Sequence, residues 1–242
     1  MFGGCLKMGK AFDPLLIIEF LPTLLHYLGV TLEILAASIF LGLILGVAAA
    51  IPRLFKIPFL NQLVILYVSF IRGTPILIQL FLVFYGLPAI LMIFNIDISK
   101  LEAIYFVIIT YAISNGASFS EIFRGAIRAV DKGQTEAAYS VGMTSTQNFF
   151  RIVLPQALRI AFPNMANSFI GSLKDTSLAF SIGVMDMVGR GDTLISATAH
   201  ALEVYITLSI IYYAVVLLFE KIFNKLEKHF NRYQSADLSV AA

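Results

Sequence analysis

A short polar sequence, KDTS at residues 174–177, stands between two apolar stretches of the chain. An ionisable residue inside a membrane-spanning helix is costly and usually faces protein or a water-filled cavity. At such a depth Asp175 could accept hydrogen bonds from an ammonium group, and Lys174 could meet a carboxylate. The two neighbouring hydroxyls would add weaker contacts, from Thr176 and Ser177. The pattern predicts either contacts to a charged solute or polar links between helices, and it leaves both open.

Further polar residues lie within apolar stretches. Asn164 and Asn167 are about one helical turn apart and could line the same pathway, and Gln79 is a third uncharged candidate. A helix that is unwound near Gly171–Ser177 would expose backbone groups to such a pathway, as discontinuous helices do in transporters. The hypothesis that Asp175 contacts the solute is tied to such a break.

Other charged residues are expected to have structural roles. Glu121, Arg124 and Arg128 are at helical spacing and predict an ion pair near the inner end of a span. The sequence RGTP at 72–75 predicts a bend at the inner membrane face, because Gly and Pro interrupt the backbone hydrogen bonds of a helix. Solvated positions at the outer ends of spans are expected for Glu102, His200 and Glu203.

Residues 131–155 predict a helical hairpin in an otherwise apolar chain. Asp131 with Gln134 resembles a capping box, which begins a short helix that can run to Val141. Gly142 then suits the left-handed position that follows a helix end, because a side chain is penalised there.

A second short helix is predicted after this glycine. Thr144 and Gln147 form another capping-box pair. Pro155 lacks an N–H and suits the first turn of the next helix or a kink at its entry. The first helix carries one carboxylate beside two methyl-sized side chains, a smooth ridge that can seat in a groove of a partner. A loop that only connects two spans has no need of such a ridge.

The composition of the whole chain is that of an integral membrane protein. Of its 242 residues, 59% are hydrophobic and 13% are charged, and the mean hydropathy is +0.86; soluble domains carry about 25% charged residues. The single Cys5 excludes a disulfide framework and a multi-cysteine metal site. No basic run is dense enough for nucleic acid. We predict an all-α membrane fold with no metal site and no nucleic-acid partner.

Five spans are predicted, since a spanning helix needs about 20 mostly apolar residues. They follow a short amphipathic lead-in at 14–24 and cover 25–51, ended by Pro52; 76–94, preceded by an oily segment at 58–71; 101–120; 160–188, interrupted by KDTS; and 201–219. In the first span Gly42 and Gly46 are four residues apart, which lets two backbones approach closely. An Ala/Gly-rich helix also produces this spacing by chance.

The distribution of Lys and Arg predicts the orientation of the chain. Four basic residues outside the spans fall on one side of the predicted membrane, and the side of the hairpin holds twelve: Arg53, Lys56, Arg72, Arg124, Arg128, Lys132, Arg151, Arg159, Lys221, Lys225, Lys228 and Arg232. We therefore expect an extracytoplasmic tail at 1–14, a transmembrane domain at 15–230 with the hairpin at about 131–155, and a cytoplasmic tail at 231–242.

Residues 136–155 match the EAA motif found in membrane subunits of ABC importers. The motif consists of Glu-Ala-Ala, three residues, Gly, nine residues, Ile, one residue and Leu-Pro, and every position and spacing agrees. The matching residues are Glu136, Ala137, Ala138, Gly142, Ile152, Leu154 and Pro155. Three further segments resemble signatures of the polar amino acid branch of this family, the branch of the histidine, glutamine, arginine and cystine permeases: 70–88, 121–138 and 154–178.

The resemblance covers roughly residues 15–230 and implies a type I importer permease fold with five spans. It implies import of a polar amino acid, with cystine as one candidate, through a prokaryotic plasma membrane. A second permease subunit, identical or paralogous, would complete the pathway. The EAA helix of each would dock on one of two cytoplasmic ABC ATPase subunits, and an extracytoplasmic binding protein would deliver the substrate.

No nucleotide-binding loop is present in the sequence itself. The nearest approach to GxxxxGK[ST], the sequence GSLKDTS, has the wrong spacing. We therefore expect no ATP hydrolysis and no bound cofactor in this chain, with ATP and Mg²⁺ used by the partner ATPase. The alternative is an ion-coupled secondary transporter or a channel subunit. The hairpin argues against it, because a self-sufficient transporter would not need a docking element.

Overall fold

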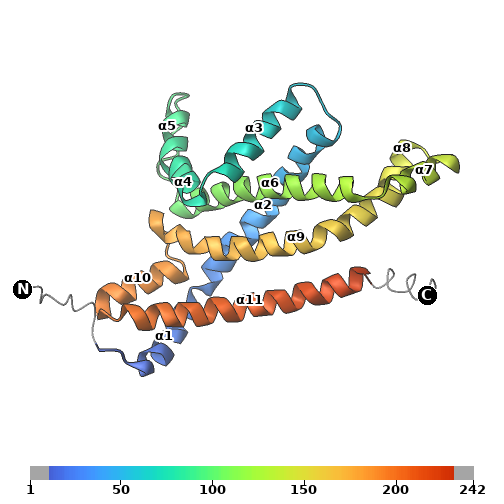
Figure 1. Cartoon of the computed structure of the whole chain (residues 1–242). Coiled ribbons are helices and arrows are strands. Elements are labelled where there is room, and N and C mark those ends of the chain that lie inside the picture. The colour runs from blue at the N-terminus through green and yellow to red at the C-terminus, as the bar shows by residue number, and fades with distance from the viewer. Residues whose placement is uncertain (1–10, 232–242) are drawn as a thin grey trace, which may run out of the picture.

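All regular structure in the computed structural model, which describes residues 11–231, is helical (Figure 1). The α-helices are α1 Pro14–His26, α2 Leu28–Leu54, α3 Leu60–Gly73, α4 Ile76–Phe81, α5 Leu87–Met92, α6 Ala103–Ala129, α7 Lys132–Ser140, α8 Ser145–Asn148, α9 Leu154–Asp175, α10 Met187–Thr198 and α11 Ala201–Asn231. Two π-helical turns, η1 Leu82–Gly86 and η2 Phe149–Val153, and one 3₁₀ helix, η3 Thr176–Ile182, complete the chain.

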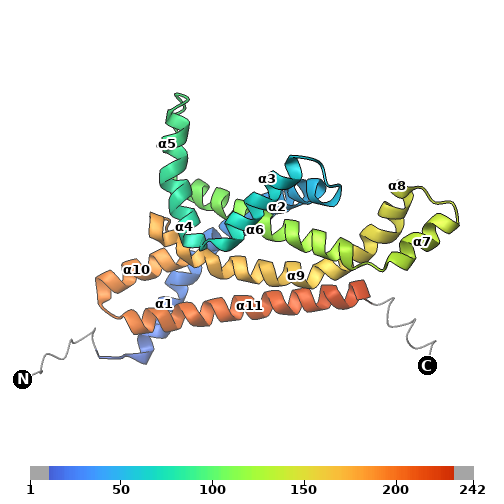
Figure 2. The ribbon, with the colours of Figure 1, turned by 45° about the horizontal axis from the view of Figure 1, so that its top comes forward.

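Three long helices run along the length of the molecule. Both views show α6, α9 and α11 side by side in alternating directions, with α2 crossing them at an angle (Figures 1 and 2). The hairpin of α7 and α8 lies at one end of this bundle, and α10 lies near the other end. The long helices therefore run from the hairpin to the opposite end of the bundle, where α1 begins.

The crossing of α2 and α6 is built from glycines. A Cβ added to Gly42 would lie 2.6 Å from the Cβ of Asn115, and one added to Gly46 would lie 2.6 Å from the Cβ of Phe119. On the facing helix, a Cβ added to Gly116 would lie 2.8 Å from the Cβ of Leu45. The spacing of Gly42 and Gly46 thus serves close packing within this chain, because a side chain at either position would force the helices apart.

The bend at residues 72–75 lies elsewhere than predicted. Thr74 is extended (φ −118°, ψ 144°), as the residue before a proline usually is, and α4 begins after Pro75. The hydrophobic residues of α4 pack with Phe106 and Val107, close to the first turn of α6 and far from the hairpin at its other end. The prediction of an inner-face position was therefore wrong, and Arg72 leaves the group of basic residues on the hairpin side.

The lengths of the helices also correct several predicted boundaries. Pro52 does not end α2, which continues to Leu54, because the amides of Phe55 and Ile57 still donate to carbonyls of the last turn. The amphipathic lead-in is confirmed as α1. Most of the two predicted tails, 1–14 and 231–242, lies outside the described residues.

Among the described residues, three helices are long and apolar enough to cross a membrane: α2, α6 and α11 up to His229. A fourth span results if α3 and the segment Ile76–Met92, which are bent by 113° at their junction, are counted as one. Helix α9 has 22 residues, about 33 Å at 1.5 Å per residue. That length suffices for a bilayer, but the helix is too polar to be recognised by composition, and the number of five spans stays a prediction.

The end of α11 near α1 contains a buried carboxylate. Glu203 is 2% exposed, and its Oε1 accepts a hydrogen bond from the backbone N–H of Asp13 at 2.8 Å and lies 3.0 Å from Nδ1 of His200. Thr207 donates to the carbonyl of Ile17 at 3.3 Å. The expectation of a solvated Glu203 was wrong, because α1 folds back on α11 and covers it.

Candidate coupling hairpin and solute pathway

Helix α7 begins and ends as its sequence predicts, with small differences. Asp131 is the N-cap, and its Oδ1 accepts from the backbone N–H of Gly133 at 2.6 Å. The reciprocal bond that Gln134 would make in a capping box is not found among the described contacts of this helix start. The helix ends at Ser140, one residue before the predicted end.

Gly142 adopts the predicted left-handed conformation, with φ +79°. The N–H of Met143 donates to the carbonyl of Ala138, and the N–H of Gly142 donates to that of Tyr139, each at 3.0 Å. These two bonds form a Schellman motif, which satisfies carbonyls at the end of α7. A residue with a Cβ would be strained at position 142 even though no other atom lies within 4 Å of the site.

The second half of the hairpin enters the membrane domain without a break. The predicted capping box of Thr144 and Gln147 is confirmed with both reciprocal bonds, at 3.3 and 2.9 Å. Helix α8 then continues through the π-helical turn η2 into α9, where Pro155 occupies the first turn. One continuous helical segment therefore connects the hairpin to Asp175 at the far end of α9.

The matched EAA residues divide between an inner and an outer face of the hairpin. Ala138 is buried, and Asn148 donates across the hairpin to the hydroxyl of Thr135 at 3.4 Å. Glu136 and Ala137 are exposed, as are Gly142 and Pro155, whereas Ile152 and Leu154 are half-buried. The hairpin is thus closed internally and presents its acidic and small residues outward.

Three polar residues of α9 lie on one exposed face. Asn164, Asn167 and Lys174 are exposed and separated by three and seven residues, with Gly171 between them. This spacing places them on one stripe of the helix. The unwinding to which the pathway hypothesis is tied is not found over most of Gly171–Ser177, since α9 stays helical to Asp175 and only tightens to 3₁₀ at Thr176.

The chain changes direction later, at Gly183, where φ is +86°. Before that point the KDTS residues have distinct environments. The Asp175 side chain is half-buried, and its carbonyl accepts a 2.6 Å bond from the hydroxyl of Tyr111 on α6. The hydroxyls of Thr176 and Ser177 donate to backbone carbonyls three residues earlier, at 2.6 and 2.7 Å. Thr176 is fully buried, so the accessible members of this group are the charged ones and Ser177.

The side chain of Gln79 is hydrogen-bonded to the backbone of the bend between α3 and α4. The side chain is 5% exposed, and its Nε2 donates to the carbonyls of Ile71 and Thr74 at 2.7 and 2.9 Å. These carbonyls are left without helical partners where α3 ends. In this conformation Gln79 stabilises the bend and does not face the stripe of α9.

Further polar links, which were not predicted from the sequence, join α6 to its neighbouring helices. Ser172 on α9 donates to Oδ1 of Asn115 on α6 at 2.6 Å. Glu121 pairs with Arg124 as expected, at 2.5 Å, and also with Arg53 of α2 at 2.6 Å, whereas Arg128 is exposed. In the sequence, such residues can be recognised only as polar residues within an apolar helix. Their partners depend on how the helices cross, which the sequence pattern does not show.

The arrangement of these helices is that of ABC importer permeases. A chain from "Crystal structure of an amino acid ABC transporter with histidines" matches with a TM-score of 0.82 and 31% identity, over 91% of this chain and 100% of that chain. A chain of the inward-facing MetNI methionine ABC transporter matches with a TM-score of 0.70 and 16% identity, over 91% and 99%. The second likeness concerns the fold alone.

Residues 39–232 match the family described as "Binding-protein-dependent transport system inner membrane component", and the chain belongs to this family. One relative, the L-cystine transport system permease protein TcyL of Bacillus subtilis (strain 168), is 57% identical over 233 residues, 96% of this chain and 98% of that protein. The chain is accordingly a permease subunit of an ABC importer, and ATP hydrolysis lies in a partner subunit. The alternative of an ion-coupled transporter or a channel is set aside.

Proposed function

We propose that this subunit forms the membrane pathway for cystine or a closely related amino acid. The observation that carries the proposal is the 57% identity, over almost the whole chain, to a permease of an L-cystine transport system. The 31% identity to a chain of a solved amino acid transporter supports the wider substrate class. Cystine presents two ammonium and two carboxylate groups, so its pathway must offer both acceptors and donors.

The hairpin of α7 and α8 is the proposed contact to the ATPase. Its backbone is capped at Asp131, at Gly142 and at Thr144, so it keeps its shape without a partner. Its outer face leaves Glu136 and Ala137 exposed, and Val141 at the tip is 76% exposed. An apolar tip beside one carboxylate, on a rigid support, favours insertion into a cleft that supplies a cation.

The exposed stripe of α9 is the proposed lining of the pathway. Asn164 and Asn167 provide amide donors and acceptors, and Lys174 and Asp175 provide opposite charges at the end of the helix. A polar stripe on a membrane helix is costly against lipid, so a second permease subunit, identical or paralogous, is expected to face it. The two subunits would pair with two ATPase subunits and one extracytoplasmic binding protein.

The orientation with the hairpin and the C-terminus in the cytoplasm remains part of the proposal. Without Arg72, the basic residues on the hairpin side still outnumber those on the other side. After replacement of Cys5 by Ser, Lys132→Cys should react with an impermeant maleimide only after the cells are opened, and Asp97→Cys should react in intact cells. The reverse pattern would contradict the orientation.

Transport by the assembled complex tests the function. The chain would be purified with its ATPase and reconstituted with the binding protein, and ATP hydrolysis and uptake would be measured over a panel of amino acids. We expect cystine to stimulate both most strongly, with weaker effects from other polar amino acids. Equal responses to all amino acids, or strongest uptake of one unlike cystine, would contradict the assignment of substrate but not the class of protein.

A further inference from the structure

An apolar groove lies next to the hairpin, outside the polar stripe of α9. Its volume is about 690 Å³, and it is lined by α2, α6, α9 and the hairpin. The helices contribute hydrophobic residues to the walls of the groove, for example Ile51 and Leu54 of α2, Phe123 of α6 and Leu158 of α9. Polar lining residues gather where the hairpin closes the groove, at Ser145, Thr146 and Asn148.

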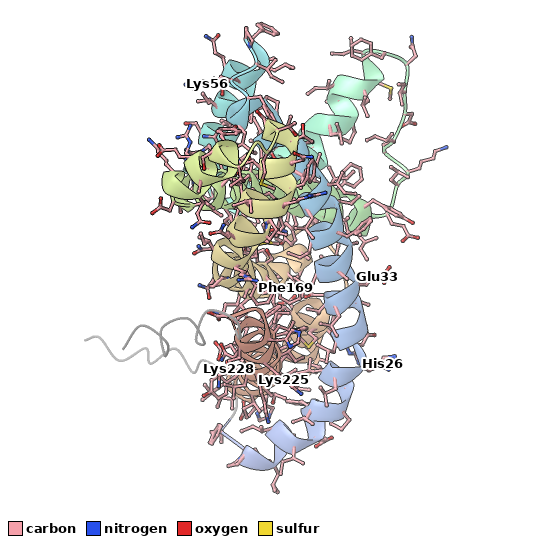
Figure 3. All side chains as sticks on the ribbon, turned by 90° about the vertical axis from the view of Figure 1, so that its right-hand side faces the viewer. His26, Glu33, Lys56, Phe169, Lys225 and Lys228 are labelled. Carbon is pink, nitrogen blue, oxygen red and sulfur yellow. The ribbon has the colours of Figure 1, made fainter. Side chains whose placement is uncertain are left out.

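At the mouth of the groove, two exposed aromatic residues are each followed in the chain by an exposed basic residue. Phe55 and Phe150, which both line it, are 68% and 61% exposed. Lys56 and Arg151 follow them directly in the chain, and both are exposed. Figure 3, which views the molecule from the hairpin end, shows Lys56 near the top of the view, well separated from Lys225 and Lys228 of α11 in the lower middle.

The ion pairs in the neighbourhood of the groove do not involve Lys56 or Arg151. Glu121, the acid nearest in the chain to the α6 wall, is already shared by Arg53 and Arg124. Lys56 and Arg151 make no ion pair with any described residue. The groove thus has a hydrophobic interior at the end of membrane-crossing helices, and these two basic residues directly follow residues of its mouth in the chain.

We propose that this groove binds one acyl chain of an anionic phospholipid, with its phosphate held near Lys56 and Arg151. The charge favours this occupant, since basic pockets between membrane helices on the cytoplasmic side attract acidic head groups. The walls favour it as well, because they offer an acyl chain continuous apolar contact and offer a protein segment few polar partners. Because the hairpin closes the groove, the lipid would touch the element proposed to contact the ATPase.

The test uses the complete permease–ATPase complex in nanodiscs of phosphatidylethanolamine and phosphatidylglycerol. After purification, mass spectrometry would count the phosphatidylglycerol molecules that each complex retains. The double variant Lys56→Gln/Arg151→Gln should retain less, by about fivefold for each charge removed, as expected for a basic side chain near an anionic surface. The matched control is Lys225→Gln/Lys228→Gln, which removes two exposed charges at the same end of the bundle and should retain phosphatidylglycerol as the unmodified complex does.

A second variant tests the acyl site independently of charge. Leu158→Trp enlarges a groove residue that is 51% exposed, and Leu217→Trp makes the same change on α11 at a residue that is 45% exposed. Only Leu158→Trp should lower lipid retention. Equal retention by the groove and control variants would overturn the proposal. So would crosslinking of a photoreactive residue at position 150 to a second permease or ATPase chain instead of to lipid.

Discussion

The crossing of α2 and α6 and the hairpin of α7 and α8 both depend on glycine, but for opposite reasons. At the crossing, Gly46 faces atoms that leave no room for a Cβ, while its backbone is ordinary helix. In the hairpin, Gly142 has open space around it, and its backbone has a positive φ. The first glycine is required by a neighbour within the chain, and the second by the local path of the backbone.

The surroundings of the two regions differ in the same way. Around the crossing, Ser172 donates to Oδ1 of Asn115, and Tyr67 donates to the carbonyl of Ile113, each at 2.6 Å. In the hairpin the backbone is satisfied, but side chains such as Glu136 and Val141 are left exposed. Substitutions at the crossing should therefore prevent the subunit from folding. Substitutions in the hairpin should leave the subunit folded but abolish its coupling to the ATPase.

The largest effect is expected for Gly46→Leu. The added side chain meets the Cβ of Phe119 at its first atom, so α2 and α6 cannot keep their crossing, and no folded subunit should be recovered. The milder Gly46→Ala should cost about 1–3 kcal/mol of stability. Size-exclusion profiles and thermal unfolding in detergent would measure both. Gly125→Ala, on α6 where no atom lies within 4 Å of the added Cβ, should behave as unmodified protein; comparable damage there would contradict the role of the crossing.

Gly142→Val should abolish substrate-stimulated ATP hydrolysis while the subunit still inserts and folds. The left-handed backbone penalises a side chain by about 1–2 kcal/mol, and a branched side chain would also alter the exposed tip of the hairpin. Comparison of expression, complex assembly and coupled uptake would separate these effects. Asn tolerates the left-handed conformation, so Gly142→Asn serves as a control. If Gly142→Asn restores uptake, backbone strain explains the loss in Gly142→Val; if uptake stays lost, the added side chain obstructs docking. Normal uptake by Gly142→Val would refute the importance of the hairpin.

Asp175→Asn tests whether the end of α9 belongs to the pathway or to the framework. The change keeps the shape of the side chain and leaves the carbonyl that binds Tyr111 in place. If Asp175 accepts the substrate ammonium, the affinity of uptake should fall by roughly 10- to 100-fold, since hydrogen bonds to charged groups contribute about 1.5–3 kcal/mol. Basal ATP hydrolysis and assembly should be unchanged. Loss of assembly would instead assign Asp175 to the framework.

The smallest effect is expected for Tyr111→Phe, which removes one link between α6 and the end of α9. The lost 2.6 Å bond should lower stability by about 0.5–1.5 kcal/mol, seen as a melting temperature a few degrees lower. Substrate affinity should change less than in Asp175→Asn, because the charge remains. A larger loss of affinity than of stability would mean that this bond positions Asp175 for the substrate.

Local features of the fold followed from the sequence. The left-handed glycine at 142, the capping box at Thr144 and the pairing of Glu121 with Arg124 depend on residues a few positions apart, and all are confirmed. Predictions that needed a distant partner were less successful. Glu203 lies under α1, and Gln79 is used by the bend, because chain segments that the local pattern cannot place pack against them.

The sequence by itself determined the membrane class, the helical hairpin with its EAA spacing, and the polar stripe of α9, because hydropathy, caps and helical period act over short distances. Only the tertiary structure decided which helix Gly42 and Gly46 contact, that Thr176 is buried while Lys174 is exposed, and that the bend after α3 lies near the start of α6. These features depend on the angle and depth at which helices cross, and side chains far apart in the sequence set that geometry together.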